Sequence, residues 1–239
     1  MSHRSSFPSA RTTTSRRRWW TAAAVAVLTG SALFGAARPA GAAVTPSASA
    51  WAGYAATGGS GAFTSVSSDW TQPTAHCGSG TSYADFWAGL DGYTSTSVEQ
   101  AGTELDCSGG TASYFAWYEL YPSAPVYLSN TVRPGDTVSA SVTYAGSSKF
   151  TITVADATRG WSQTVTKTLA GAARSSAEVI TEAGSAAGVL PTNLFHQVSY
   201  TGAMVNQAGL CRSNPVASNA PGLTVSAITG CTSFTVTQT

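Results

Sequence analysis

The stretch Ser176-Ala-Glu-Val-Ile-Thr-Glu-Ala183 has the composition of a β-strand, and it is the segment from which the whole chain is best interpreted. Three consecutive β-branched residues fill its centre, and glycines punctuate both sides. Because side chains on a strand alternate between faces, Glu178, Ile180 and Glu182 share one face of the predicted sheet. Two carboxylates on one strand face are unusual in a chain with 10% charged residues, so this strand is a candidate for a functional site.

The rest of the chain after residue 50 shows the same pattern of short apolar or alternating runs separated by turn residues. No stretch there has a convincing helical period. Further strands are predicted at 51–55, 63–70, 83–90, 97–105, 113–121, 126–129, 137–144, 150–155, 161–169, 195–200, 223–228 and 234–237. Many short strands at regular spacing predict an all-β sandwich of two antiparallel sheets.

The N-terminal segment has the three parts of an export signal. Arginines occupy positions 16–18, an apolar run follows at 19–36, and Ala40-Gly-Ala42 has the form of a cleavage site. The run is too short and too rich in Ala and Gly for a membrane anchor. We therefore predict a secreted, extracellular protein with no membrane association after cleavage, by either the general or the twin-arginine route. The expected division is a signal peptide at 1–42, a short leader at 43–50 and one domain at 51–239.

Removal of the signal changes the charge of the chain. Six of the 12 Lys and Arg residues lie at or before Arg38, whereas none of the 11 Asp and Glu residues do, so the remaining chain has a net charge of −5. Six scattered basic groups form no phosphate-binding stripe. The composition argues against nucleic acid as a partner.

The four cysteines fit an exported protein, because an even number in such a chain indicates disulfides. Three pairings are possible, and we prefer the sequence-local one, Cys77 with Cys107 and Cys211 with Cys231. No two cysteines are close enough in sequence to match a zinc-binding pattern. We predict neither a metal site nor a cofactor.

Several hydrolase signatures are missing from the sequence. There is no Gly-x-Ser-x-Gly elbow, no His-Glu-x-x-His motif, and neither Asp-Thr-Gly nor Asp-Ser-Gly. The candidates that remain are carboxylates and a glutamine, Gln100, in Val98-Glu-Gln-Ala-Gly-Thr103. A carboxylate can act as a general base toward water, and a side-chain amide can donate a hydrogen bond to an oxyanion. We therefore expect Glu178 and Gln100 to meet across a β-sheet cleft and hydrolyse peptide bonds.

Six segments of the chain, taken in order, resemble the glutamic peptidases, or eqolisins, which are pepstatin-insensitive acid endopeptidases. The resemblance covers nearly all of residues 51–239. The matching segments are Trp51-Ala-Gly-Tyr54, Val66-Ser-Ser-Asp-Trp70 with Pro73, Trp87-Ala-Gly-Leu-Asp-Gly92, Glu99-Gln-Ala-Gly102, Trp117-Tyr-Glu-Leu-Tyr-Pro122 and Ala177-Glu-Val-Ile-Thr-Glu182.

This resemblance implies a sandwich of two bent antiparallel sheets, a concanavalin- or lectin-like jelly roll, with a concave substrate groove. It implies that Glu178 is general base and then acid, and that Gln100 holds the water and stabilises the oxyanion. The substrates would be proteins or peptides, cleaved by a monomer. Substrate-binding residues are expected at Trp51, Trp87, Asp91, Glu119 and Glu182.

The chain departs from the family pattern at three positions near these residues. Val179 follows the catalytic Glu where Trp is common, Glu99 replaces an apolar residue before Gln100, and Leu120 replaces a Trp. The departures leave open an inactive relative that only binds peptides. A second alternative is a secreted glycan-binding module, because exposed aromatic residues on a sandwich can stack on sugar rings.

Overall fold

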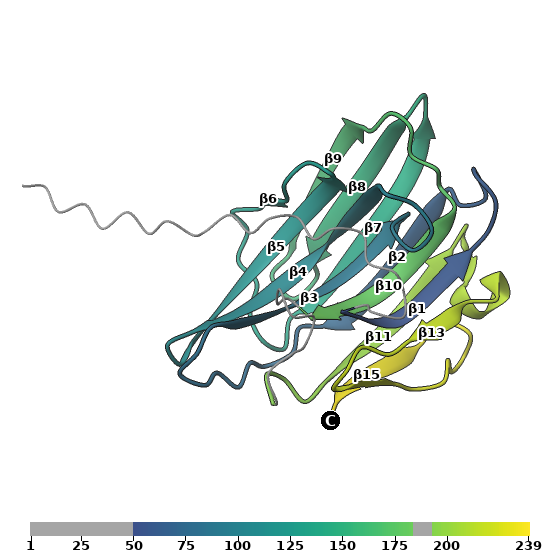
Figure 1. Ribbon diagram of the computed structural model, residues 1–239. Coiled ribbons are helices and arrows are strands. Elements are labelled where there is room, and N and C mark those ends of the chain that lie inside the picture. Colours follow the sequence, from purple (N-terminus) through teal and green to yellow (C-terminus); the bar gives the residue numbers. More distant parts are fainter. Residues whose placement is uncertain (1–49, 184–192) are drawn as a thin grey trace, which may run out of the picture. The chain divides into compact units, whose positions relative to one another are not determined.

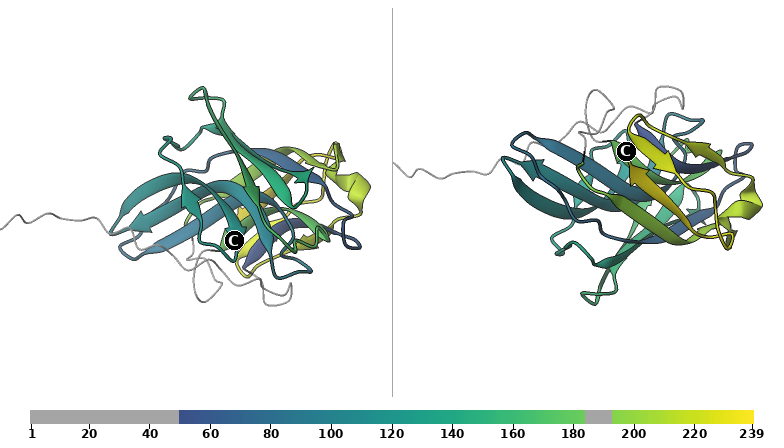
Figure 2. Two further views of the ribbon diagram at one scale, coloured as in Figure 1. Left: turned by 90° about the horizontal axis from the view of Figure 1, so that it is seen from above. Right: turned by 90° about the horizontal axis from the view of Figure 1, so that it is seen from below.

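The computed structural model describes residues 50–183 and 193–239, and these residues form two antiparallel sheets (Figure 1). Sheet A consists, in spatial order, of β13 (Val216–Ser218), β1 (Trp51–Thr57), β10 (Ser176–Ala183), β3 (Ser82–Leu90), β4 (Val98–Ser108), β5 (Thr111–Tyr121) and β6 (Val126–Tyr127). Sheet B consists of β14 (Leu223–Val225), β15 (Phe234–Gln238), β11 (Gln197–Val205), β2 (Ser65–Thr71), β7 (Thr137–Gly146), β8 (Lys149–Asp156) and β9 (Trp161–Thr168), with β12 (Ala208–Gly209) beside β11. Figure 2 shows the same layers from above and below.

The predicted all-β sandwich is confirmed, and the strand at 176–183 has the predicted bounds. The predicted strand at 195–200 is longer than expected, because β11 continues to Val205. Strands β12 and β13 and the 3-10 helix η2 (Leu210–Ser213) were not predicted from the sequence. Each is four residues or shorter, too short for an alternation of apolar and polar residues to show.

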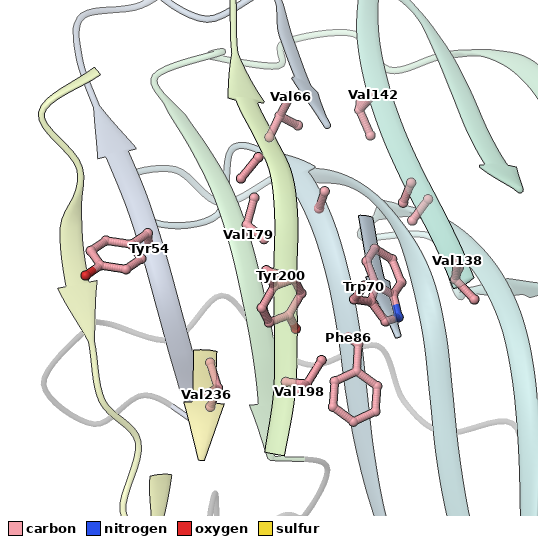
Figure 3. Close-up of a cluster of buried hydrophobic side chains, with 14 of the residues drawn as sticks. Tyr54, Val66, Trp70, Phe86, Val138, Val142, Val179, Val198, Tyr200 and Val236 are labelled. Atoms are coloured by element: carbon pink, nitrogen blue, oxygen red, sulfur yellow. The ribbon is translucent and has the colours of Figure 1, made fainter. Parts of the chain in front are cut away.

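The core lies between the two sheets, as the close-up in Figure 3 shows. Tyr54, Phe86 and Val179 project from sheet A toward Trp70 and Tyr200 of sheet B, and all five are at most 8% exposed. Burying one such side chain contributes roughly 1.5–3 kcal/mol to folding. Because alternate residues of β1, β3 and β10 fill this core, the intervening residues lie on the face of sheet A directed away from sheet B. We call this face the outer face.

Both disulfides have the predicted sequence-local pairing. Cys77 is bonded to Cys107, which fixes the loop before β3 to the end of β4, and Cys211 is bonded to Cys231, which fixes η2 to the segment before β15. No cysteine of the chain is free. The disulfides hold the margins of the sandwich and lie outside the strand centres that carry the candidate site.

The predicted export signal at 1–42 and leader at 43–49 lie outside the described residues. Within the described ranges, no helix is long and apolar enough to cross a membrane.

Candidate active site

Four neighbouring strands of sheet A bring the two predicted catalytic residues into one row. Glu178 of β10 pairs with Gly89 of β3, Gly89 pairs with Gln100 of β4, and Gln100 pairs with Glu119 of β5. Directly paired residues present their side chains on the same face of a sheet. Glu178 and Gln100 therefore share the outer face, two strand spacings or about 10 Å apart at the backbone.

Gly89, between these two residues, has no side chain, and its neighbours pack closely against it. A Cβ at this position would lie 2.9 Å from the Gln100 Cβ and 3.0 Å from the Trp87 Cζ3 atom. Real Cβ atoms rarely approach other atoms so closely, so even alanine would displace a neighbour. The glycine thus lets the Gln100 side chain and the Trp87 ring approach the backbone of β3 between Glu178 and Gln100.

Glu178 is fully buried, and neither of its carboxyl oxygens makes a hydrogen bond to any described residue. Burial raises the pKa of Glu178 well above its ordinary value, and the nearby charges of Asp91 and Glu99 raise it further, whereas the Ser176 side chain lowers it. The Ser176 hydroxyl also has no hydrogen-bond partner within the described ranges. Glu178 therefore holds a proton in acid solution.

Gln100 is oriented by its other neighbour in the row. Its Nε2 donates a hydrogen bond of 2.6 Å to Oε2 of Glu119, while its Oε1 accepts none from the described part of the chain. Burial raises the pKa of Glu119 to about 7, the bond from Gln100 lowers it, and the charge of Glu182 raises it. Gln100 thus keeps one amide proton and its carbonyl oxygen for other partners.

An apolar cluster covers the outer face beside this row. It consists of Trp51, Trp87, Trp117 and Ile180, with Tyr93 packed against it, and we call it the outer cluster. Trp51 and Trp87 meet edge to face with ring centroids 4.9 Å apart. Nε1 of Trp87 donates to Oε2 of Glu182 at 3.1 Å. The three indoles are at most 5% exposed, which leaves little ring surface for a sugar.

Asp91 lies below the outer face, in the loop after β3. It is fully buried, and its carboxylate accepts hydrogen bonds from the backbone N–H groups of Arg174 at 2.7 Å and Ser175 at 2.9 Å. Its backbone N–H donates to the Ser176 carbonyl. Asp91 therefore fixes the turn that leads into β10, and contact with a substrate through this carboxylate stays a prediction.

Glu99 was noted from the sequence only as a departure from the family pattern. It pairs with Leu90 and Leu120, so it lies on the core face, is fully buried, and has no hydrogen bond to either oxygen among the described residues. Burial, with the charge of Asp91, raises its pKa to about 8. Alternation along 97–105 could have revealed this position, because Glu99 is out of phase with Gln100.

Acidic and sulfur ligands do not converge on a metal site. In the described ranges no three His, Cys, Asp or Glu side chains are placed to hold a metal ion.

A sandwich with a buried carboxyl group and an amide on one sheet face has the architecture of a glutamic peptidase. The family model described as "Peptidase A4 family" matches residues 49–238, and the chain belongs to this family. It is therefore a hydrolase, a glutamic-type endopeptidase. A search of curated proteins gave no match.

Solved structures agree on the fold. Scytalido-glutamic peptidase with a transition-state analogue inhibitor is 23% identical, with a TM-score of 0.66, over 80% of this chain and 98% of that chain. SCP-B, a member of the eqolisin family in a complex with the tripeptide Ala-Ile-His, is 22% identical, with a TM-score of 0.62 and the same coverage. Aspergilloglutamic peptidase from Aspergillus niger is 27% identical, with a TM-score of 0.58, over 66% of this chain and 99% of that chain.

Proposed function

We propose that the protein is an exported acid endopeptidase in which Glu178 and Gln100 hydrolyse the peptide bond without a covalent intermediate or a cofactor. The observation that carries the proposal is the row Glu178–Gly89–Gln100, which presents an acid and an amide on one sheet face. The two disulfides support export, because disulfides persist in oxidising environments. The predicted signal at 1–42 supports it as well.

Glu178 transfers the protons of the reaction. As a carboxylate it takes a proton from the attacking water, whose oxygen forms a bond to the carbonyl carbon. As a carboxylic acid it then gives this proton to the amine while the C–N bond breaks. Its raised pKa suits the second step directly. The first step needs the ionised form, so the bound water and substrate must stabilise the carboxylate by hydrogen bonds.

Gln100 provides the polar groups that the tetrahedral intermediate needs. Its Oε1 can accept a hydrogen bond from the attacking water, and its second Nε2 proton can donate to the oxyanion. The hydrogen bond to Glu119 holds the amide in one orientation, which lowers the cost of reorganisation during the reaction. Glu119 thus acts on the reaction through Gln100.

The outer face provides the substrate-binding surface in this proposal. Trp51 and Trp87 form the buried apolar packing beneath this surface, and the Trp87 indole holds Glu182 in place. Resistance to pepstatin is expected because the site has no pair of aspartates sharing a proton. Asp91 belongs to the site through the turn that it fixes.

The test compares wild-type protein with Glu178→Gln and Gln100→Ala on a denatured protein substrate between pH 2.5 and 7, with and without pepstatin. We expect acid-range, pepstatin-resistant cleavage that falls by roughly 10³-fold in both variants. Asp69→Asn, a carboxylate of β2 in sheet B, is the matched control and should keep wild-type activity. Full activity of folded Glu178→Gln would refute the proposal.

The pH dependence adds a second criterion. The pH dependence of kcat/KM reports the pKa values of the free enzyme, and the pH dependence of kcat reports those of the enzyme–substrate complex. If substrate stabilises the carboxylate of Glu178, the kcat profile will show a lower apparent pKa than the kcat/KM profile. Identical profiles that decline with rising pH would show that protonated Glu178 begins the reaction.

A further inference from the structure

The loop between β3 and β4, residues 91–97, is held in place at several points beside the active-site row. The hydroxyls of Thr94 and Ser175 are 2.7 Å apart and share a hydrogen bond. Ser95 Oγ accepts from the backbone N–H of Gly92 at 3.1 Å and lies 3.3 Å from the Ser97 carbonyl, to which it donates. Together with the bonds to Asp91, these contacts make the loop a fixed part of the site.

Tyr93 is the one aromatic residue of this loop, and its ring packs against the outer cluster. The ring is partly buried. The side-chain hydrogen bonds that hold the loop come from Thr94 and Ser95 and do not involve the Tyr93 hydroxyl. Tyrosine hydroxyls beside apolar surfaces usually find a partner. The packing therefore holds the Tyr93 ring beside the outer face, which carries Glu178 and Gln100.

Packing places Tyr93 beside β10, because its ring contacts the outer cluster, which contains Ile180, two residues from Glu178 on the same face. Burial raises the pKa of Tyr93, and the charge of Glu178 raises it further. In the reverse direction, the Tyr93 backbone lowers the pKa of Glu178. These directions agree with the packing, which brings together two residues that are 85 positions apart in the sequence.

We propose that Tyr93 is a third catalytic residue, whose hydroxyl donates a hydrogen bond to the carbonyl oxygen of the scissile bond as that oxygen becomes an oxyanion. The inference rests on the proposed function of Glu178 and Gln100. The phenol keeps its proton throughout, so the proton balance of hydrolysis is unchanged. With Gln100, the site then has two donors for the oxyanion, one from a strand and one from the anchored loop.

The decisive variant is Tyr93→Phe, which keeps the ring against the outer cluster and removes only the hydroxyl. We expect kcat to fall roughly 10- to 100-fold, with KM within twofold of wild type and an unchanged melting temperature. A peptide transition-state analogue should bind more weakly by the same factor as kcat/KM. Tyr118→Phe, on the core face of β5, is the matched control and should be unaffected.

A packing role predicts a different result. If only the ring matters, Tyr93→Phe will retain kcat within twofold while Tyr93→Leu loses activity, and the proposal is wrong. A change confined to KM would also overturn it, because the hydroxyl would then bind substrate and transition state equally. Activity of Glu178→Gln tests the proposed function separately. An inactive Glu178→Gln with an unaffected Tyr93→Phe refutes the role of Tyr93 alone.

Discussion

Replacing Glu99 by glutamine should reduce the loss of folding stability that the protein undergoes between acid and neutral pH. Glu99 is fully buried without a hydrogen bond from any described residue, and its pKa rises from 4.5 to about 8. Burial is the largest cause, Asp91 adds to it, and Arg174 opposes it. Such a shift corresponds to roughly 5 kcal/mol between the two protonation states. Because the folded-state pKa lies above the unfolded value, the fold favours protonated Glu99.

The sign of the effect follows from proton linkage. The stability associated with protonated Glu99 is fully present below about pH 4.5 and is lost as the pH rises through about 8. Glutamine has the shape of the protonated acid but cannot ionise. We therefore expect the unfolding free energy of Glu99→Gln, minus that of wild type, to grow by about 1.4 kcal/mol per pH unit across this window.

Urea unfolding followed by tryptophan fluorescence at pH 4, 6 and 8 measures this difference. Taking the difference between proteins cancels the contribution of Glu119. Glu178 adds to the difference in the same direction, because the charge of Glu99 raises its pKa in the wild type. Val98→Ala is the control on the same strand, because it removes buried apolar volume at a cost independent of pH. A Glu99→Gln difference that stays constant between pH 4 and 8 would refute the reasoning.

Two further substitutions test the geometry of the row and of the loop. Gly89→Ala places a Cβ 2.9 Å from that of Gln100, so we expect kcat/KM to fall at least about 10-fold at a stability cost of roughly 1–3 kcal/mol; steady-state kinetics within twofold of wild type would contradict this. Asp91→Asn weakens the bonds from Arg174 and Ser175, so urea unfolding should show a loss of about 2 kcal/mol, and an unchanged midpoint would exclude the anchoring role.

The sandwich was predictable because its signals are local. Alternation and β-branched residues marked β10 at its observed bounds, and turn residues separated most of the remaining strands. Strand order was not predictable in this way. Sheet A places β10 between β1 and β3, whereas its neighbours in sequence, β9 and β11, lie in sheet B. No local pattern specifies partners so far away in sequence.

The sequence predicted which residues form the candidate site, but it predicted their arrangement in space only in part. The sequence placed Glu178 and Glu182 on one face, as observed, but it did not identify Gly89 as the residue between Glu178 and Gln100. Tyr93 has no sequence signal, since its place depends on where the loop after β3 is fixed. The sequence marked Glu99 as a departure from the family pattern. Its burial was not predictable, because it depends on Leu90 and Leu120 of the neighbouring strands.

The charges of the chain divide between the sheets in a way that favours an acid environment. Eight of the 11 acidic residues lie in β3, β4, β5 and β10 or in the loop after β3, whereas the strands of sheet A contain no Lys or Arg. Buried carboxyls without cationic partners are stable only when protonated or hydrogen-bonded. Glu99, Glu119 and Glu178 all have raised pKa values for this reason, with burial as the largest cause. The carboxyl groups of the sheet that carries the candidate dyad are therefore protonated in the folded protein at acid pH. We expect the protein to be most stable in this acid range, in which an acid endopeptidase is active.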